Sequence, residues 1–317
     1  MNNFWQKLKR PFFVLAPMYD VTDTAFRQII VRCGKPDVMM TEFVSVDGLA
    51  HIQSQKKITK HLLTFSQKER PLVAQIFGVN LENIEKAAAY LQKLKFDGID
   101  INMGCPDKKV VAMGAGAALV RDTKRAKEII IAAKKGAPKL PISVKIRTGY
   151  EKDVTEKWVS ALLETAPAAI TIHARTKKDM SKVPARWDEV KKAVHLARES
   201  QTLIIGNGDI HSLKEAQKKA QESGAQGVMI GRGALMNPWI FSGREYQEIS
   251  QKEKIKTMLM HAKLFEKYTQ STRSFMHFKK HIKNYVNGFN GSATLRAQLM
   301  KANSAKELSA ITKEYFK

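Results

Sequence analysis

Short apolar runs recur along the chain between residues 12 and 233, and segments with a helical pattern separate them. Each run is continuously apolar and rich in β-favouring residues, with no strict alternation of apolar and polar positions. That pattern is typical of strands that a parallel sheet buries on both faces. The predicted strands cover residues 12–18, 38–44, 71–78, 98–104, 142–149, 169–175, 203–209 and 227–233.

The segments between these strands carry signals for the ends of helices. Asn80 precedes the amphipathic run LENIEKAAAYLQKLK, and Ser212 with Glu215 has the spacing of a capping box. Gly136 and Gly224 are expected to stop helices. The chain therefore alternates predicted strands with predicted helices.

Eight strand–helix units within about 240 residues predict an α/β fold, namely a (β/α)8 TIM barrel. A doubly wound sheet is the alternative. Such a sheet usually carries a glycine fingerprint after its first strand, where this chain has Ala16-Pro17-Met18. The barrel is therefore the favoured architecture.

The last part of the chain has a different pattern. From residue 251 to residue 317 no strand-like run occurs, and the segments KIKTMLMHAKLFEKYTQ and SFMHFKKHIKNYVNGF have helical patterns. This part holds 14 Lys or Arg against 4 Asp or Glu. We expect a catalytic barrel over residues 1–245, and a basic, all-helical C-terminal domain over residues 246–317.

The net charge of the chain indicates which kind of partner it is expected to bind. The chain has 54 Lys and Arg against 30 Asp and Glu, a net charge of +24, which indicates a polyanionic partner. A proteome that is generally rich in lysine is the alternative explanation.

Two cysteines and no CxxC or HExxH pairing predict neither a disulfide framework nor a metal site, and favour a reducing, cytoplasmic setting. No stretch approaches the ~20 apolar residues of a membrane span, so no membrane association is expected.

Polar or glycine residues stand at the ends of the predicted strands after the first, which ends in Pro17-Met18. In (β/α)8 barrels, chemistry is located at the carboxyl ends of the strands. Each residue alone also has a structural interpretation, such as a satisfied core histidine, but the eight strand ends together favour an active site. They are Pro17 and Met18, Glu42, Gln75, Asn102 with Cys105, Lys145 with Arg147, His173 with Arg175, Asn207 with Asp209, and Gly231 with Arg232.

The last two of these strand ends indicate a phosphate site. GNGD at 206–209 and GRG at 231–233 place small residues where backbone N–H groups can approach a phosphate closely. Gly114-Ala115-Gly116 lacks the third glycine of a dinucleotide fingerprint, and no Walker lysine–serine pair occurs. A phosphate-bearing cofactor in the barrel mouth is therefore favoured over ATP.

Taken together, these motifs resemble those of the tRNA-dihydrouridine synthases, flavoenzymes that reduce uridines in tRNA. The matching segments are APMYDVTDTAFR (16–27), TEFVS (41–45), VAQIFG (73–78), DINMGCPDKKV (100–110), VKIRTG (144–149), IHART (172–176), GNGDI (206–210), MIGRGAL (229–235) and FKKHIKNYVNGFNGSATLR (278–296). The family usually has a loop with glutamine and tyrosine after IHART, where this chain has KKDMSKVPARW (177–187). That departure concerns how this loop contacts RNA.

The resemblance implies FMN as cofactor, NADPH or NADH as electron donor, and tRNA as substrate. Cys105 is implied as the proton donor to uracil C5, and a thiol with its usual pKa of about 8.5 is protonated near neutral pH. The cofactor-binding residues implied are Pro17, Met18, Gln75, Lys145, His173, Asn207, Asp209, Gly231 and Arg232. The substrate-binding residues expected are Glu42, Asn102, Arg147, Lys279, Lys280, Lys283 and Arg296.

Two other functions stay open. A flavin-dependent oxidoreductase acting on a free pyrimidine or on orotate would share the hydride chemistry without needing the basic C-terminal segment. A non-catalytic RNA-binding module would not need the complete flavin set. A monomer is the expected assembly.

Overall fold

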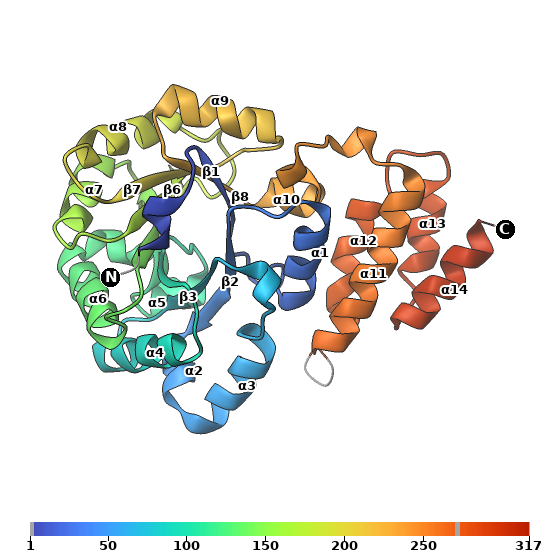
Figure 1. Ribbon diagram of the computed structural model, residues 1–317, viewed down its shortest axis with the longest axis horizontal. Helices are drawn as coiled ribbons and strands as arrows, with labels where there is room; N and C mark the ends of the chain where they lie inside the picture. Colours follow the sequence, from blue (N-terminus) through green and yellow to red (C-terminus); the bar gives the residue numbers. More distant parts are fainter. Residues whose placement is uncertain (1–2, 270–272, 317) are drawn as a thin grey trace.

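Eight parallel strands close into a barrel in the computed structural model, which describes residues 3–269 and 273–316 (Figure 1). Neighbouring strands pair in chain order, and β1 pairs with β8 to close the ring. The predicted TIM barrel is confirmed. The strands are β1 (Phe12–Leu15), β2 (Val38–Ser45), β3 (Leu72–Phe77), β4 (Gly98–Met103), β5 (Ile142–Gly149), β6 (Ala169–Thr176), β7 (Leu203–Asn207) and β8 (Gly227–Ile230).

Three strands end two or three residues earlier than predicted, each for a local reason. β1 stops before Pro17, which has no backbone N–H for the ladder. β7 stops before Gly208, whose φ of +137° is not a strand conformation. β8 stops before Gly231, which precedes a short helix. These residues therefore lie in loops at the rim of the barrel, where a ligand can reach their backbone.

Apolar side chains fill the interior of the barrel because its wall is buried on both faces. Phe12, Val14, Met40 and Met229 belong to one fully buried cluster inside the ring. A Cβ on Gly227 would lie 2.3 Å from the Phe12 ring, so the β1–β8 closure requires glycine there. The continuous apolar runs in the sequence correspond to this two-sided burial.

Helices cover the outside of the barrel, and the predicted helix ends are found. Asn80 and Ser212 accept hydrogen bonds from backbone N–H groups at the starts of α4 and α9, and Gly224 ends α9 at a φ of +72°. The helices are α1 (Thr24–Gly34), α2 (Val46–Ala50), α3 (Ile52–Leu62), α4 (Leu81–Lys93), α5 (Lys108–Ala112), α6 (Thr123–Gly136), α7 (Thr155–Leu163), α8 (Trp187–Ala197), α9 (Leu213–Ser223) and α10 (Arg232–Met236). Short 3₁₀ helices are η1 (Phe4–Lys7), η2 (Gln67–Glu69), η3 (Gly116–Arg121), η4 (Ile240–Ser242) and η5 (Tyr246–Glu248).

The described residues after 248 are helical, as predicted, and form a bundle beside α1 (Figure 1). Its helices are α11 (Gln251–Thr269), α12 (Met276–Tyr285), α13 (Ser292–Leu299) and α14 (Ala305–Tyr315). Phe265, Phe278 and Leu295 are buried in a cluster that also contains Ala25 of α1. The Phe26 ring of α1 stacks 5.7 Å from a histidine ring of α12. The bundle thus shares a core with one barrel helix.

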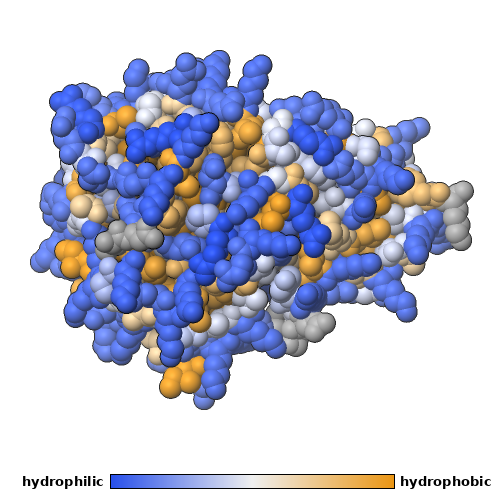
Figure 2. All heavy atoms as spheres, in the orientation of Figure 1, coloured by the Kyte–Doolittle hydropathy of each residue, from blue (hydrophilic) through white to orange (hydrophobic). Residues whose placement is uncertain are grey.

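Hydrophilic side chains cover much of the face seen in Figure 2, with smaller apolar patches between them. Among the described residues, no helix combines the length and apolar character needed to cross a bilayer.

Candidate active site

The carboxyl ends of five strands border a cavity of about 220 Å³ at the barrel mouth. Eight of the sequence-predicted residues line it, because parallel strands of a closed barrel all end at one rim. The cavity lies on the side of the rim formed by β1 and β5–β8. These lining residues are Pro17, Met18, Lys145, His173, Asn207, Asp209, Gly231 and Arg232.

Lys145 places a cation in the wall of this cavity. Its Nζ donates to Asn207 Oδ1 at 3.1 Å, and Asn207 Nδ2 donates to Met229 O at 2.9 Å. Burial and the neighbouring Arg147 lower the pKa of Lys145 to about 8, while Asp100 opposes that change. The ammonium is therefore mostly charged near neutral pH and is well placed to stabilise an anionic group.

Asp209, which lines the cavity, organises two arginines. Its carboxylate pairs with Arg175, and with Arg232 at 3.0 Å, and it accepts the Ala185 N–H at 2.9 Å. Burial raises the pKa of Asp209, but the hydrogen bond and charge of Arg175, with Arg232, outweigh burial and leave the pKa below its usual value. Asp209 is thus an anion that holds two cations in place.

His173 is a neutral side chain in this basic environment. Burial lowers its pKa, and the cations Lys145, Arg147 and Arg175 lower it further. A guanidinium only donates, so Arg175 Nη1 donates to His173 Nε2 at 3.3 Å. The neutral ring therefore carries its proton on Nδ1.

Cys105 lies in the loop between β4 and α5, where several contacts hold it. Ala117 N donates to Cys105 O at 3.0 Å, and Arg147 Nε donates to Gly104 O at 2.9 Å. A Cβ on Gly104 would lie 3.1 Å from the carbonyl carbon of Ile146, so glycine lets this loop approach β5. Burial raises the pKa of the Cys105 thiol above its ordinary value. The thiol is therefore protonated near neutral pH.

Gln75 and Asn102 lie beneath this loop and contact each other. Asn102 Nδ2 donates to Gln75 Oε1 at 3.0 Å. Asn102 Oδ1 accepts the N–H groups of Gly104 and Cys105 at 3.1 and 2.9 Å. These two amides therefore support the cysteine loop directly.

Glu42 is fully buried and is engaged by the helical bundle. Arg273 Nη2 donates to both of its carboxylate oxygens, at 3.0 and 3.1 Å, and Asp20 N donates to Oε1 at 2.5 Å. The Asp20 carboxylate pairs with Lys280 and His277 of α12. Sequence reasoning missed Arg273, because it stands 231 positions from Glu42 and no local pattern relates the two.

The four basic residues of the C-terminal segment that were expected to bind RNA occupy different environments. Lys279 is buried and donates to Asn303 at 3.3 Å. Lys280 is partly buried in the pair just described, and Arg296 Nη1 donates to a backbone carbonyl at the end of α12 at 2.7 Å. Lys283 alone among the four has an exposed side chain. They do not form one exposed patch.

The divergent loop 177–187 packs against the cavity. Ser181 lines it. Arg147 Nη1 donates to the Met180 carbonyl at 3.1 Å, and Arg175 Nε donates to the Val183 carbonyl at 2.6 Å. Two arginines of the site therefore also hold this loop, for which the sequence offered no structural signal.

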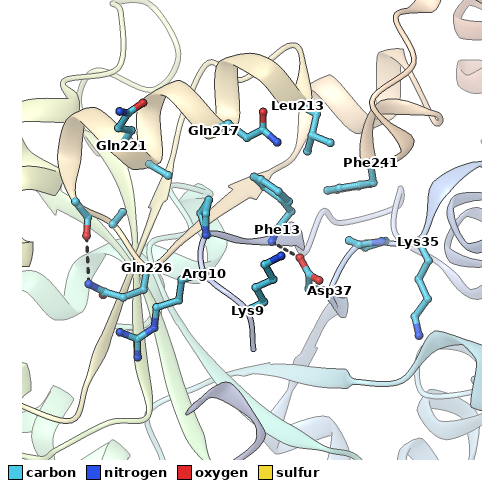
Figure 3. Close-up of a pocket in the computed structure, with 15 residues that line it drawn as sticks. Lys9, Arg10, Phe13, Lys35, Asp37, Leu213, Gln217, Gln221, Gln226 and Phe241 are labelled. Carbon is cyan, nitrogen blue, oxygen red and sulfur yellow. Dashed lines mark hydrogen bonds between the residues drawn. The ribbon is translucent and has the colours of Figure 1, made fainter. Parts of the chain in front are cut away.

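A larger cavity, of about 960 Å³, lies at the opposite end of the barrel (Figure 3). Phe13, at the start of β1, and Phe241 contribute apolar walls, and Asp37 accepts the Phe13 N–H at 2.7 Å. None of the eight predicted residues that line the smaller cavity lines this one, and Gln75 and Cys105 are in neither lining. The smaller cavity is therefore the candidate active site.

Comparison with known proteins identifies relatives over nearly the whole chain. A family model described as "Dihydrouridine synthase (Dus)" matches residues 14–317. A "Probable tRNA-dihydrouridine synthase" of Staphylococcus aureus (strain COL) is 40% identical over 318 aligned positions, which cover 99% of this chain and 96% of that protein. A "Probable tRNA-dihydrouridine synthase 2" of Bacillus subtilis (strain 168) is 39% identical, with 99% of this chain and 97% of that protein covered.

Solved structures with a similar barrel are more distant. Histamine dehydrogenase from Rhizobium sp. 4-9 has a TM-score of 0.55 at 12% identity, covering 80% of this chain and 48% of that chain. A morphinone reductase in complex with tetrahydroNAD has a TM-score of 0.50 at 10% identity, covering 74% and 86%. At such identities the likeness establishes the fold alone.

Proposed function

The chain belongs to the dihydrouridine synthase family, and from that premise we propose that it reduces the C5–C6 double bond of a uridine in tRNA, with FMN as cofactor. The observation that carries the chemistry is a protonated thiol, Cys105, held by its loop at the same rim as a cavity lined by Lys145 and Arg232. The tRNA substrate is inferred from the family membership.

The residues present fit a flavin mononucleotide. Arg232, held by Asp209 beside Gly208 and Gly231, offers a charged and sterically open site for a phosphate. A carboxylate repels phosphate, so we assign Asp209 to holding the arginines rather than to contacting the phosphate. Pro17, Met18, Gln75, His173 and Asn207 are assigned to the rest of the cofactor. Reduced flavin supplies the hydride for uracil C6 when bound, and NADPH or NADH is the proposed electron donor.

Lys145 would stabilise negative charge, and Cys105 would donate a proton. The Lys145 ammonium stabilises negative charge on the flavin ring, because it is positioned in advance in a desolvated wall. Cys105 donates the proton to uracil C5, and its raised pKa keeps the proton available at physiological pH. Asn102 and Arg147 hold the loop that carries the thiol, and Asn102 retains a second N–H for the uracil edge.

The helical bundle, residues 246–317, is proposed as the tRNA-binding domain. Turning a stacked uridine out of folded tRNA requires contacts to the surrounding phosphates. Of the four basic residues considered, Lys283 is assigned to that surface because its side chain is exposed. Lys279, Lys280 and Arg296 are assigned to holding the bundle together or against the barrel. Because Glu42 is buried behind Arg273, we likewise assign it to anchoring the bundle rather than to binding uracil. A cytoplasmic monomer suffices for this scheme.

Two experiments test the function. Dihydrouridine mapping in tRNA from cells lacking the gene should reveal a missing modification, which the gene should restore. The purified protein should bind FMN non-covalently, and its reduced form should be reoxidised by unmodified tRNA. Efficient reduction of free uracil or orotate, with no activity on tRNA, would instead favour the free-base oxidoreductase.

A further inference from the structure

Asp100 is a buried carboxylate in the middle of β4, outside the lining of the cavity. Its side chain is inaccessible to solvent. Oδ2 accepts from Gln75 Nε2 on β3 at 2.7 Å, and Oδ1 accepts from Ser143 Oγ on β5 at 2.7 Å. Burial raises the pKa of Asp100 to about 6. The group is therefore still mostly an acceptor-only carboxylate near neutral pH.

The hydrogen bonds continue from Asp100 to the cysteine loop without a break. Gln75 uses Nε2 for Asp100 and Oε1 to accept from Asn102 Nδ2 at 3.0 Å. Asn102 then uses Oδ1 for the N–H groups of Gly104 and Cys105. We define this series, from Asp100 through Gln75 and Asn102 to Cys105, as the amide chain.

The chemistry of its two ends sets the direction of every bond in the amide chain. An ionised carboxylate can only accept, and a backbone N–H can only donate. If the Gln75 amide turned over, its oxygen would face the Asp100 carboxylate and its nitrogen would face Asn102 Nδ2. If Asn102 turned over as well, its NH₂ group would face two N–H donors in the loop. Buried donors and acceptors left without partners are costly, so one arrangement is favoured.

We propose that Asp100 is a positioning residue for Cys105, acting through Gln75 and Asn102; the proposal rests on the role of Cys105 as proton donor. Removing the acceptor at position 100 frees Gln75 to turn over, which frees Asn102 and releases the loop. The same arrangement leaves each amide a second N–H for a ligand in the mouth. Asp100 therefore orients both amides as well as the loop that carries the thiol.

Two substitutions at position 100 separate this role from general stabilisation. Asp100→Leu removes both acceptors at similar size. Asp100→Asn keeps an oxygen that can accept from Gln75, and its NH₂ group can donate to the Ser143 hydroxyl oxygen. The hydroxyl hydrogen of Ser143 can then turn to the Ile99 carbonyl, which lies 3.4 Å from Ser143 Oγ. With FMN saturating and the fold checked by circular dichroism, Asp100→Leu should slow reoxidation of the flavin by tRNA ~10–100-fold. Asp100→Asn should stay within about threefold of the parent.

Alkylation of Cys105 by iodoacetamide provides a readout that does not depend on turnover. Peptide mapping separates this thiol from Cys33. Asp100→Leu should alkylate at least about threefold faster, because a loosened loop exposes a half-buried thiol more often. If Asp100→Leu matched the parent in both alkylation and reoxidation while Cys105→Ala was inactive, the positioning role would be wrong. If Cys105→Ala kept full activity on tRNA, the role of Cys105 as proton donor, on which this proposal rests, would fail, whatever the alkylation result. Absence of any activity of the parent on tRNA would be the separate failure of the proposed function.

Gln75→Glu tests the direction of the bonds even if Asp100→Leu does not fold. Two carboxyls at hydrogen-bond distance share one proton, so the introduced group donates to Asp100 and accepts from Asn102 only while that proton is present. The rate of tRNA reduction, relative to the parent, should therefore fall as pH rises from about 6 to about 9. A relative rate that is independent of pH would overturn the amide chain.

Discussion

The residues predicted at the barrel mouth lie close together, whereas the basic residues predicted in the helical bundle do not. At the mouth, residues drawn from five strands line one cavity. In the bundle, Lys279, Lys280, Lys283 and Arg296 are dispersed among a buried site, a contact with the barrel, an exposed face and a helix end. Polar residues at strand ends therefore predicted a site, whereas basic residues on helices did not predict a surface.

Geometry explains the difference. In a closed parallel barrel, the carboxyl end of every strand lies at the same rim, whatever the neighbouring sequence. A charged residue on a helix can point to solvent, to another helix or to the barrel, and the sequence period identifies a face without its partner. Lys280 illustrates this: its ammonium pairs with Asp20 in the β1–α1 loop. The following predictions test whether the two regions are as different as their contacts indicate.

The largest effect is expected at the mouth, from Cys105→Ala. Loss of the proton donor should slow reoxidation of FMN by tRNA ~10²–10⁴-fold, while FMN content and reduction by NADPH stay unchanged. Stopped-flow absorbance of the flavin measures both half-reactions. Cys33→Ala is the matched control, because Cys33 lies at the end of α1 and burial raises its pKa to about 12. Reoxidation of Cys105→Ala at the parental rate would make this cysteine structural.

Arg232→Ala should weaken FMN binding about tenfold by removing a charged hydrogen bond to the phosphate. Quenching of FMN fluorescence on titration with apoprotein gives the dissociation constant. Arg198→Ala removes an arginine that is exposed outside the cavity, next to Glu199 on the surface, and should leave FMN affinity unchanged. Equal affinities for the parent and Arg232→Ala would remove the β8 loop from the phosphate site.

Lys145→Met should make the reduction potential of bound FMN more negative by about 30 mV, if the lost charge stabilises the reduced ring by ~1.4 kcal/mol. The pKa of Lys145 is lowered to about 8, so its ammonium is charged below that pH and increasingly neutral above it. The difference from the parent should therefore shrink as pH rises past about 8. Bound anionic flavin raises that pKa and moves the change upward. Potentiometric titration across this range checks the prediction, and a constant difference would contradict it.

The smallest effects, in the bundle, compare Lys283→Gln with Lys280→Gln. If Lys283 contacts a phosphate, its loss should make the slope of log affinity for tRNA against log salt shallower by up to ~0.9. Lys280→Gln should leave that slope unchanged and instead lower the unfolding temperature by about 2 °C, because its partly buried pair joins bundle and barrel. The reverse result for the two variants would show that the bundle presents a different face to RNA.

The local chemistry of the chain was sufficient for the fold and for much of the candidate site. Eight apolar runs separated by helix caps such as Asn80 and Ser212 indicated a parallel sheet covered on both faces, and the absence of a glycine fingerprint after the first strand favoured the barrel that the structure shows. Gly208 and Gly231 mark the loops where a backbone can approach a ligand. Cys105 lies just after the strand that ends at Met103, in the break formed by Gly104-Cys105-Pro106. Each inference needed only neighbouring residues and the rule that parallel strands finish at one rim.

Only the tertiary structure decided how side chains far apart in the sequence share hydrogen bonds and charge. Asp209 holds Arg175 and Arg232, and Asp100 connects with Cys105 through Gln75 and Asn102. The bond between Arg273 and Glu42 joins the bundle to the barrel across 231 positions. Such pairings depend on distances of about 3 Å between atoms, and these are set by packing of whole elements rather than by any local pattern. That is why residues at the strand ends, Asp209 and Gln75 among them, could be named from the sequence, whereas their pairings and the parts of Asp100 and Arg273 could not.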